Sequence, residues 1–591
     1  MTKSLLLLLS TLIISFFTGC TLQPKPEKNF SLEILHLDDT HSHITSERMK
    51  FKVAGKKVYF EVGGYPRIIT KVDELISKNP NHLILNAGDV FQGTLYYSLF
   101  RGEADAKMLN LIPWDAYELG NHEFDDGDEA LSNFLDKLNP TIAVLGANIV
   151  VQGNDPLKGK IKPYIIKDIN GQKVAVIGID EVYKTINSSN PGKDLKFLDE
   201  LTTAQRYIDK LSNEGIDKII LLTHQGYEND IKMAQNLKGV DAIIGGDSHT
   251  LLGNFKALGL KSISDSYPTV TTSKDGKKVC IAHAWEYGHI LGDLKVTFDA
   301  KGDVLSCGGN PLLLIGDTFL VKNKKGKKVP VSNETKTKIL VLVNKSSNIA
   351  ITKEDTKALN IIKKFKKEVD KKKSIVIGKA LEDLGHNRIP GDKKDGKHIL
   401  PLGSDIAPIV AKAFYDLSKT SDAAIQNAGG VRIAINKGDI TMGEAYRLLP
   451  FANTLYQIKM SGSEVKQVLE DAIANIKKGG STGSFPYAYA LRYDVDMSQP
   501  IGNTISNLEI KDRKTGKWSK IDPNKIYIIV TNSYTAGGKD GYVTFKTAQE
   551  KRGKGVDTYL DYAMSFIRYV QKNKNIKKLP REDHPIKSFK K

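Results

Sequence analysis

Cysteine is rare in this sequence, and its scarcity excludes several kinds of site. The 591 residues contain three cysteines, Cys20, Cys280 and Cys307. Two cysteines in the body of the chain cannot form the disulfide framework of a small secreted domain, nor a closed zinc site of four thiolates. Neither is a convincing nucleophile. In an exported protein Cys280 and Cys307 can pair, or both can remain buried free thiols.

Long apolar runs are also missing beyond the N-terminus. Leu5 to Phe17 is apolar, but this run is too short for a comfortable transmembrane helix and has the plan of a secretory signal. The small residues before Cys20 resemble a bacterial lipobox. We therefore predict a signal peptide over residues 1–19, a lipid on Cys20 and a flexible tether over residues 20–30, which would hold the protein at a membrane in the periplasm or cell envelope. Ordinary signal cleavage nearby, or a retained anchor, is the alternative.

A nucleic-acid recognition motif is absent, although the net charge is +18. The lysines occur in scattered runs without interleaved aromatic residues. This pattern predicts a solvated lysine-rich surface and no nucleic-acid partner, with a field that attracts small anionic substrates. The chain is too long for one hydrophobic core, so we expect two domains and a connector.

Five predicted strands in the first half of the chain each end in polar residues. The strands are expected at residues 31–37, 82–85, 114–119, 218–222 and 240–244. Helical spacing is found at residues 64–77, 128–138, 203–213 and 229–237. Strands that alternate with helices predict an α/β sheet, whose ligands gather beyond the carboxyl ends of the strands. The side chains expected to meet there are Asp39, His41, Asp89, Asn121, His224, Asp247 and His249.

These seven side chains offer oxygen and imidazole donors and no thiolate. That donor set suits Zn²⁺, Mn²⁺ or iron. Seven ligands are too many for one tetrahedral ion, so we predict two divalent metal ions that share a carboxylate, roughly 3.5–4 Å apart.

The motifs match, in order, those of the calcineurin-like metallophosphoesterases. They are Asp39-Thr40-His41, Gly88-Asp89, Gly120-Asn121-His122-Glu123, His224 and Gly246-Asp247-Ser248-His249. The longer stretches 88–94 and 120–125 resemble the 5′-nucleotidase branch, which includes bacterial periplasmic UDP-sugar hydrolases and NAD nucleotidases. Residues 266–269 and 284–287 resemble NAD nucleotidase segments near the site. The resemblance implies an N-terminal four-layer metallophosphoesterase-like β-sandwich with flanking helices.

The resemblance also implies how the two ions are held. Asp39, His41, Asp89 and His249 would bind one ion, and Asp89, Asn121, His224 and Asp247 the other. Asp89 would bridge the two. Asp247 departs from the commoner histidine of the Gly-His-Ser-His pattern.

The second half of the chain carries three further motifs of the same family. They are residues 423–432, 448–454 and 532–542. The resemblance implies a C-terminal mixed α/β nucleotide-binding domain, in which Phe451 and Tyr534 hold a nucleobase between them. Asn427 and Asp540 would bind base or ribose. Arg432 would meet phosphate, and Arg388, in a stretch that matches less well, is a second candidate for that role.

The predicted domains follow from these motifs. We expect the metal domain at residues 31–322, a linker at 323–373 and the nucleotide domain at 374–585. Apolar residues recur every three or four positions within Asp355 to Lys371, which predicts a connector helix there. The overall fold class is therefore α/β (α+β).

The reaction expected is hydrolysis by a water held between the two ions. His122 is not assigned as a ligand, and we expect it to donate a hydrogen bond or proton to the leaving oxygen. Asp125 would fix its tautomer, or would cap the helix that follows. We expect a monomer that acts on nucleoside 5′-monophosphates and on the pyrophosphate of NAD or UDP-sugars. The alternatives are a 2′,3′-cyclic phosphodiesterase with 3′-nucleotidase activity, and a non-catalytic nucleotide-binding surface lipoprotein.

Overall fold

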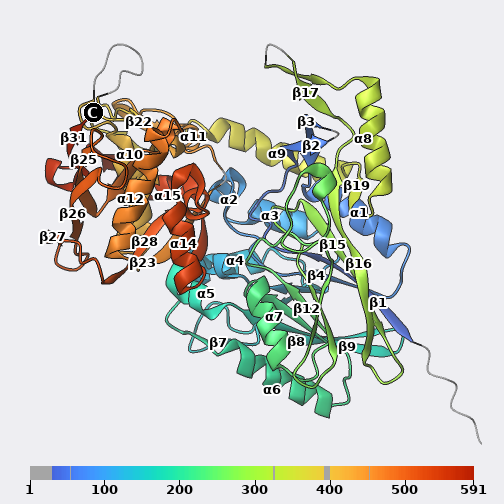
Figure 1. The fold of residues 1–591 in the computed structure, drawn as a ribbon. Coiled ribbons are helices and arrows are strands. Elements are labelled where there is room, and N and C mark those ends of the chain that lie inside the picture. Colours follow the sequence, from blue (N-terminus) through green and yellow to red (C-terminus); the bar gives the residue numbers. More distant parts are fainter. Residues whose placement is uncertain (1–28, 54, 324–325, 392–399, 452) are drawn as a thin grey trace, which may run out of the picture.

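The computed structural model describes residues 29–591 apart from residues 54, 324–325, 392–399 and 452. Cys20, the predicted signal peptide and nearly all of the predicted tether lie outside this part. Among the described residues, no helix has both the length and the apolar character needed to span a bilayer. Figure 1 shows two lobes, the first in blue to green and the last in orange to red, with the helix α9 (Thr356–Lys372) between them.

Two β-sheets face each other in the first lobe. One has eleven strands and contains β1, β4 and β5, and the other has six and contains β9, β11, β12 and β14. Their apolar faces form one core, to which β1, β4, β11 and β12 all contribute. This is the β-sandwich that the motifs implied. The strands that end in polar residues are β1 (Phe30–Leu37), β4 (His82–Asn86), β5 (Ala116–Glu118), β11 (Ile219–His224) and β12 (Ala242–Gly245).

The strand directions explain why the polar residues meet. In the large sheet β1, β4 and β5 are parallel neighbours. In the small sheet β11 lies parallel to β12 and to β9 (Gln172–Asp180). The carboxyl ends of parallel strands lie at the same edge of a sheet. The alternation of strands and helices predicted one sheet, but the strands are divided between two, and the site lies where their carboxyl edges meet.

The predicted helices of this lobe are present, with small changes at their ends. They are α1 (Tyr65–Ile76), α4 (Asp128–Leu135), α6 (Glu200–Asn213) and α7 (Tyr227–Asn236). The N-cap of α4 is Gly127, so Asp125 does not cap that helix.

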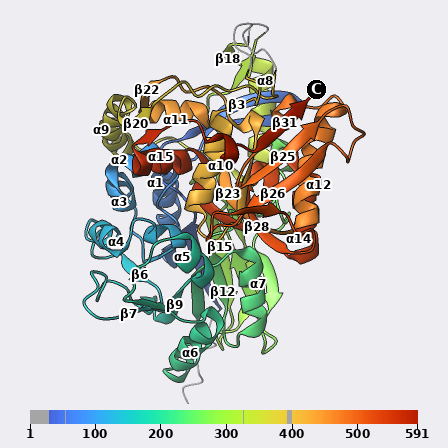
Figure 2. The same ribbon diagram turned by 90° about the vertical axis from the view of Figure 1, so that its left-hand side faces the viewer.

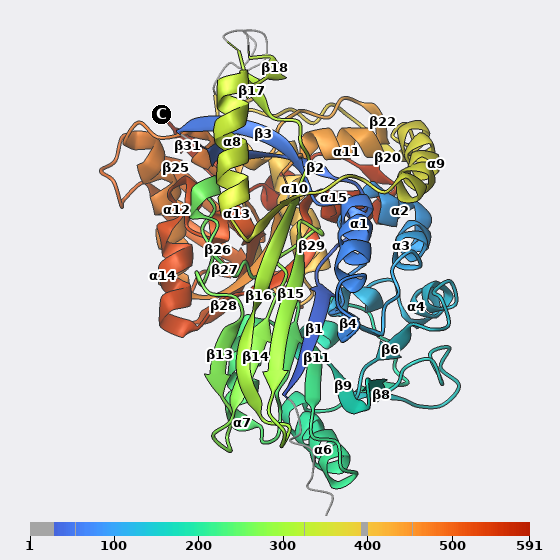
Figure 3. The same ribbon diagram turned by 90° about the vertical axis from the view of Figure 1, so that its right-hand side faces the viewer.

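A disulfide between Cys280 and Cys307 joins the two sheets. Cys280 lies in β14 (Lys278–Ala282) of the small sheet, and Cys307 lies in β16 (Val304–Ile315) of the large one. Figure 3 shows β16 and its neighbour β15 (Ile290–Phe298) as the long strands beside β1. Of the two states that the sequence left open, the structure has the paired one.

Loss of this disulfide is expected to destabilise the protein. The bond closes a loop with a sequence separation of 27, and the loop entropy that it removes from the unfolded chain corresponds to about 3–4 kcal/mol. Urea denaturation of wild type with and without a reductant measures the difference. A Cys280→Ser/Cys307→Ser variant should match the reduced wild type and not respond to the reductant. Equal free energies of unfolding for oxidised and reduced wild type would contradict the expectation.

The segment 323–373 packs with the first lobe. The strand β17 (Leu320–Lys322) pairs with β18 (Lys328–Pro330), and β19 (Ile349–Ile351) pairs with β16. The helix α8 (Asn333–Lys345) lies beside β19. The connector helix α9 is present, contacts α1, α2 and α3, and inserts Ala358 and Ile362 into the core of the lobe. Of these three helices, α2 spans Leu95–Phe100 and α3 spans Glu103–Leu109.

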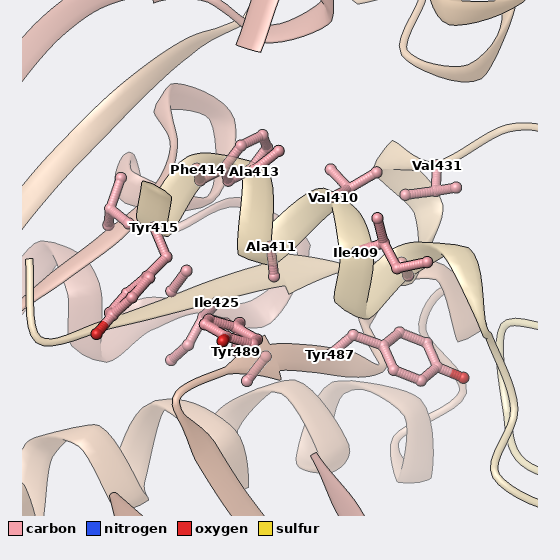
Figure 4. Packing of buried hydrophobic residues seen from close by; sticks show 14 of the residues in the cluster. Ile409, Val410, Ala411, Ala413, Phe414, Tyr415, Ile425, Val431, Tyr487 and Tyr489 are labelled. Atoms are coloured by element: carbon pink, nitrogen blue, oxygen red, sulfur yellow. The ribbon is translucent and has the colours of Figure 1, made fainter. Parts of the chain in front are cut away.

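The second lobe has its own core around a five-stranded sheet of order β24-β21-β28-β23-β29. Figure 4 shows α10 (Ile406–Leu417) lying over this sheet, with Ala411 on the side of Ile425 and Phe414 on the other side of the helix, where its ring packs against Tyr562. The strands are β21 (Ala423–Asn427), β23 (Thr454–Ser461), β24 (Pro486–Tyr489), β28 (Ile526–Asn532) and β29 (Val556–Asp561).

Candidate active site

Six of the seven predicted ligands lie close together at the carboxyl edges of the two sheets, and the seventh, Asn121, adjoins His122, whose backbone N–H donates to Oδ1 of Asp89. Nε2 of His224 lies 3.0 Å from Oδ2 of Asp89 and 3.9 Å from Oδ1 of Asp39. Nε2 of His249 lies 3.7 Å from Oδ1 of Asp39 and 3.0 Å from Nε2 of His41. Two groups of donors could each hold an ion, Asp39 with His41 and His249, and Asp39 with Asp89 and His224.

The carboxylate common to both groups is Asp39, whereas the resemblance implied Asp89. Oδ2 of Asp89 nevertheless lies 3.8 Å from Nε2 of His41 as well as 3.0 Å from Nε2 of His224. It therefore faces a histidine of each group. The assignment of ligands to individual ions stays a prediction.

The donor atoms of this cluster fit divalent cations. Within the described part of the chain, three of them are buried and lack a hydrogen-bond partner; they are Oδ2 of Asp39 and both polar atoms of the Asn121 side chain. Buried polar atoms without partners are costly, so native proteins seldom retain them without a reason. A cation would satisfy carboxylate, amide oxygen and imidazole nitrogen together.

The backbone is strained where it presents these ligands. Asp39, His41, Asp89, Asp247 and His249 all have positive φ, between 45° and 77°. Non-glycine residues rarely adopt this conformation, and its cost is maintained where surrounding structure enforces a functional geometry. The strand ends therefore turn sharply at the ligands, which aims side chains from different strands at one point.

Neighbouring carboxylates and carbonyls orient the ligands. Oε2 of Glu286 lies 2.8 Å from Nδ1 of His249. Glu123 accepts hydrogen bonds from the backbone N–H groups of Asp89, Val90 and Gly120. Such outer contacts fix the ring and loop orientation at metal sites. Sequence reasoning assigned no role to Glu286 or Glu123, although both lie in segments that matched the family.

His122 points its free ring nitrogen into the cluster. Its Nδ1 lies 2.8 Å from Oδ2 of Asp125, and its buried Nε2 has no hydrogen-bond partner in the described chain. Burial alone would lower the pKa of His122, but Asp125 and Asp89 outweigh burial and raise the pKa to about 9. With Nδ1 fixed by Asp125, Nε2 is the atom that can deliver a proton to a bound group.

Asp247 is held by a lysine that sequence reasoning missed. Nζ of Lys184 lies 2.5 Å from Oδ1 and 2.7 Å from Oδ2 of Asp247. Burial lowers the pKa of Lys184, but Asp247 and Glu181 outweigh it and keep the pKa above its usual value. An Asp–Lys pair carries no net charge, so it is electrostatically comparable with the neutral histidine more usual at this position. Lys184 lies in α5 (Val182–Ser188), far from any motif.

The second lobe contributes Tyr559 to this centre. The Tyr559 ring stacks on His249 with ring centroids 4.3 Å apart, and Nζ of Lys184 lies 4.6 Å from its centroid. Tyr559 is in β29, so a strand of the second lobe covers a ligand of the first. No sequence pattern marked this residue.

A separate cavity of about 280 Å³ in the second lobe collects the predicted substrate residues. Its lining includes all six of them, Arg388, Asn427, Arg432, Phe451, Tyr534 and Asp540. Phe451 and Tyr534 are each 44% exposed, although both are large aromatic residues. Nδ2 of Asn427 donates to Oδ2 of Asp540 over 2.9 Å. The arrangement offers two aromatic faces beside an amide, a carboxylate and two guanidinium groups.

Glycines beside a cavity can allow the backbone to approach a ligand closely. For one glycine beside this cavity, a contact within the lobe explains the absence of a side chain. Gly541 has φ 83°, and a Cβ there would lie 2.5 Å from Cβ of Asn475. Asn475 belongs to α12 (Gly462–Lys477). This glycine is therefore required by contact with a helix of the same lobe.

Comparisons with known proteins cover almost the whole chain. Residues 32–251 match the calcineurin-like phosphoesterase family model, and residues 384–547 match the 5′-nucleotidase C-terminal domain model. The chain is 40% identical to the NAD 5′-nucleotidase of Haemophilus influenzae, over 93% of this chain and 92% of that protein. It is 37% identical to a probable 5′-nucleotidase of Treponema pallidum, over 95% of each.

A solved structure supports the same assignment. The Haemophilus influenzae NAD nucleotidase superposes with a TM-score of 0.88 at 38% identity, over 95% of this chain and 99% of that one. Relatedness at this level extends through both lobes and includes the motifs that carry the donor cluster and the base cavity. The chain belongs to the 5′-nucleotidase family of calcineurin-like metallophosphoesterases.

Proposed function

We propose that this protein is a dinuclear metal-dependent 5′-nucleotidase that also hydrolyses the pyrophosphate of NAD or UDP-sugars. The observation that carries the proposal is the position of the buried donor cluster beside a cavity lined by Phe451 and Tyr534. A site that joins cations to aromatic faces suits a phosphate attached to a nucleobase. The relative named a NAD 5′-nucleotidase supports NAD as a substrate.

Different residues bind the substrate and transfer the proton. Divalent cations in the donor cluster would lower the pKa of water and neutralise phosphate oxygens. In the chemical step, the oxygen of water bonds to phosphorus, and the bond from phosphorus to the nucleoside 5′ oxygen breaks. That oxygen leaves with the proton delivered by Nε2 of His122, and the proton that the attacking water loses returns His122 to its protonated form. Arg432 lies at the mouth of the base cavity with its guanidinium carbon 5.6 Å from the Phe451 ring centroid, where it can meet phosphate.

The location of the enzyme is part of the proposal. A lipid on Cys20 would hold it at the cell envelope, where nucleotides from outside reach it first. Globomycin-sensitive processing in a bacterial host and membrane fractionation of a Cys20→Ala variant would test this, because the variant should lose membrane attachment.

A substrate panel tests the activity directly. AMP, NAD, UDP-glucose and 3′-AMP are assayed with Mn²⁺ or Zn²⁺, before and after treatment with a chelator. We expect turnover of AMP and NAD, its loss on chelation, its recovery on adding metal back, and no turnover of 3′-AMP. Turnover of 3′-AMP in preference to AMP would favour the cyclic-phosphodiesterase alternative. No turnover of any substrate by metal-loaded protein would refute the proposal.

A further inference from the structure

Two cavities adjoin the candidate metal centre. The base cavity shares Asn453 with a small pocket of about 50 Å³ that His41, His249 and Tyr559 line. His249 and Tyr559 also line a cleft of about 620 Å³. A nucleoside monophosphate needs only the base cavity and room for its phosphate at the centre. The cleft is therefore additional space that a nucleoside monophosphate does not need.

Both lobes form this cleft. The first lobe supplies α5, the start of α7 and the ligand loop that contains Asp247, and the second supplies β23 and the start of β29. Figure 2 shows α5 and α7 below β23 and the rest of the second lobe. The base cavity and the small pocket share Asn453, and the small pocket and the cleft share His249 and Tyr559, so the three adjoin one another along the donor cluster.

The lining of the cleft suits a second nucleoside. Its volume lies within the usual range for small-molecule sites. Tyr183 and Ile263 are 49% and 73% exposed, so apolar surface faces the opening. Tyr227 and Tyr456 add further aromatic surface. Lys232 and Lys554 line the cleft together with Glu228 and Asp557, and Nζ of Lys554 lies 3.9 Å from Oε1 of Glu228. Aromatic side chains bind any base by stacking, and these charged groups offer donors and acceptors to the polar groups of a nucleoside.

We infer that this cleft is a subsite for the second nucleoside of pyrophosphate-linked dinucleotides. The first nucleoside occupies the base cavity, the pyrophosphate lies at the donor cluster, and the far nucleoside extends past His249 into the cleft. This inference rests on the proposed function and adds a specificity site to it. A nucleoside monophosphate does not extend beyond the donor cluster, so the cleft residues away from that cluster, such as Tyr183 and Lys232, act on dinucleotides selectively.

A comparison of two double variants tests the subsite. Tyr183→Ala/Lys232→Ala removes one aromatic and one charged group from the cleft. Ile186→Ala/Gln235→Ala is the matched control, because each change lies on the same helix as its counterpart but outside the cleft. We expect kcat/KM for NAD to fall about tenfold or more in the cleft variant. The value for AMP should change less than twofold, and the control should resemble wild type for both.

A binding experiment gives a second readout. An NAD analogue with a methylene group in place of the bridging pyrophosphate oxygen, which resists hydrolysis, should bind the cleft variant at least about tenfold more weakly than wild type, whereas AMP should bind both proteins equally. Melting temperatures of both variants establish that they fold.

The outcomes separate the subsite from the activity. If wild type hydrolyses AMP and NAD but the cleft variant loses neither, or loses both equally, the subsite is refuted and the proposed function stands. A selective loss with UDP-glucose but not with NAD would also refute it, because the cleft would then hold a sugar. If wild type hydrolyses none of these substrates, the proposed function itself fails.

Discussion

Replacing Asp89 with asparagine is expected to lower turnover of AMP by at least about 10³-fold. Asparagine keeps the shape of the side chain and can still accept the 2.9 Å hydrogen bond from the backbone N–H of His122. What it removes is the negative charge that lies between His41 and His224. A cluster that must hold two dications depends on that charge, so metal content should fall together with activity.

Metal analysis of the purified variant is the decisive measurement. We expect fewer than two metal ions per chain by mass spectrometry, against two for wild type, and Asp209→Asn on the exposed face of α6 should retain both. An Asp89→Asn protein with full metal content and near-normal turnover would show that the carboxylate is not a ligand.

Replacing His122 with asparagine should reduce kcat for AMP by about 10²–10⁴-fold while leaving metal content unchanged. The reason is the geometry around the ring: Asp125 holds Nδ1, and Nε2 is buried, without a partner among the described residues, and directed into the cluster. The side chain can donate a proton there without serving as a ligand.

The choice of leaving group separates proton donation from a structural role. A p-nitrophenolate group leaves without protonation, whereas an alkoxide such as the 5′ oxygen of AMP needs a proton. Activity of the His122→Asn variant on p-nitrophenyl phosphate should therefore fall much less than its activity on AMP. Equal losses with both substrates would mean that His122 positions the phosphate instead of protonating the leaving oxygen.

Much of the donor cluster could be predicted because each ligand follows a recognisable strand. Asp39 comes two residues after β1, and His224 is the last residue of β11. The strand pattern alone could not show that these strands belong to opposite sheets. Nearly every residue of β1 is buried, so both faces of the strand are covered. The alternation of apolar and polar residues that marks a strand with one solvent-exposed face is therefore missing. Both arrangements bring the carboxyl ends of the strands together, so the strand pattern was sufficient to predict that these donors lie near one another; the β-sandwich itself was implied by the family resemblance.

The residues that escaped prediction act across large sequence distances. Lys184 meets Asp247 63 residues away, and Glu286 meets His249 37 residues away. Tyr559 reaches His249 from the other lobe. A lysine, a glutamate and a tyrosine in separate segments have no local pattern that joins them, because tertiary packing alone makes them neighbours. The six residues of the base cavity were found through motifs, not through spacing.

The stacking of Tyr559 on His249 has a consequence for how the protein matures. Because a strand near the C-terminus completes the wall around the donor cluster, the enclosure forms only after nearly the entire polypeptide has been synthesised. A chain that ended after α9 would leave His249 open to water, because it would lack Tyr559. It would also lack the base cavity. Both lobes are therefore needed to enclose the donor cluster, and neither lobe can enclose it alone.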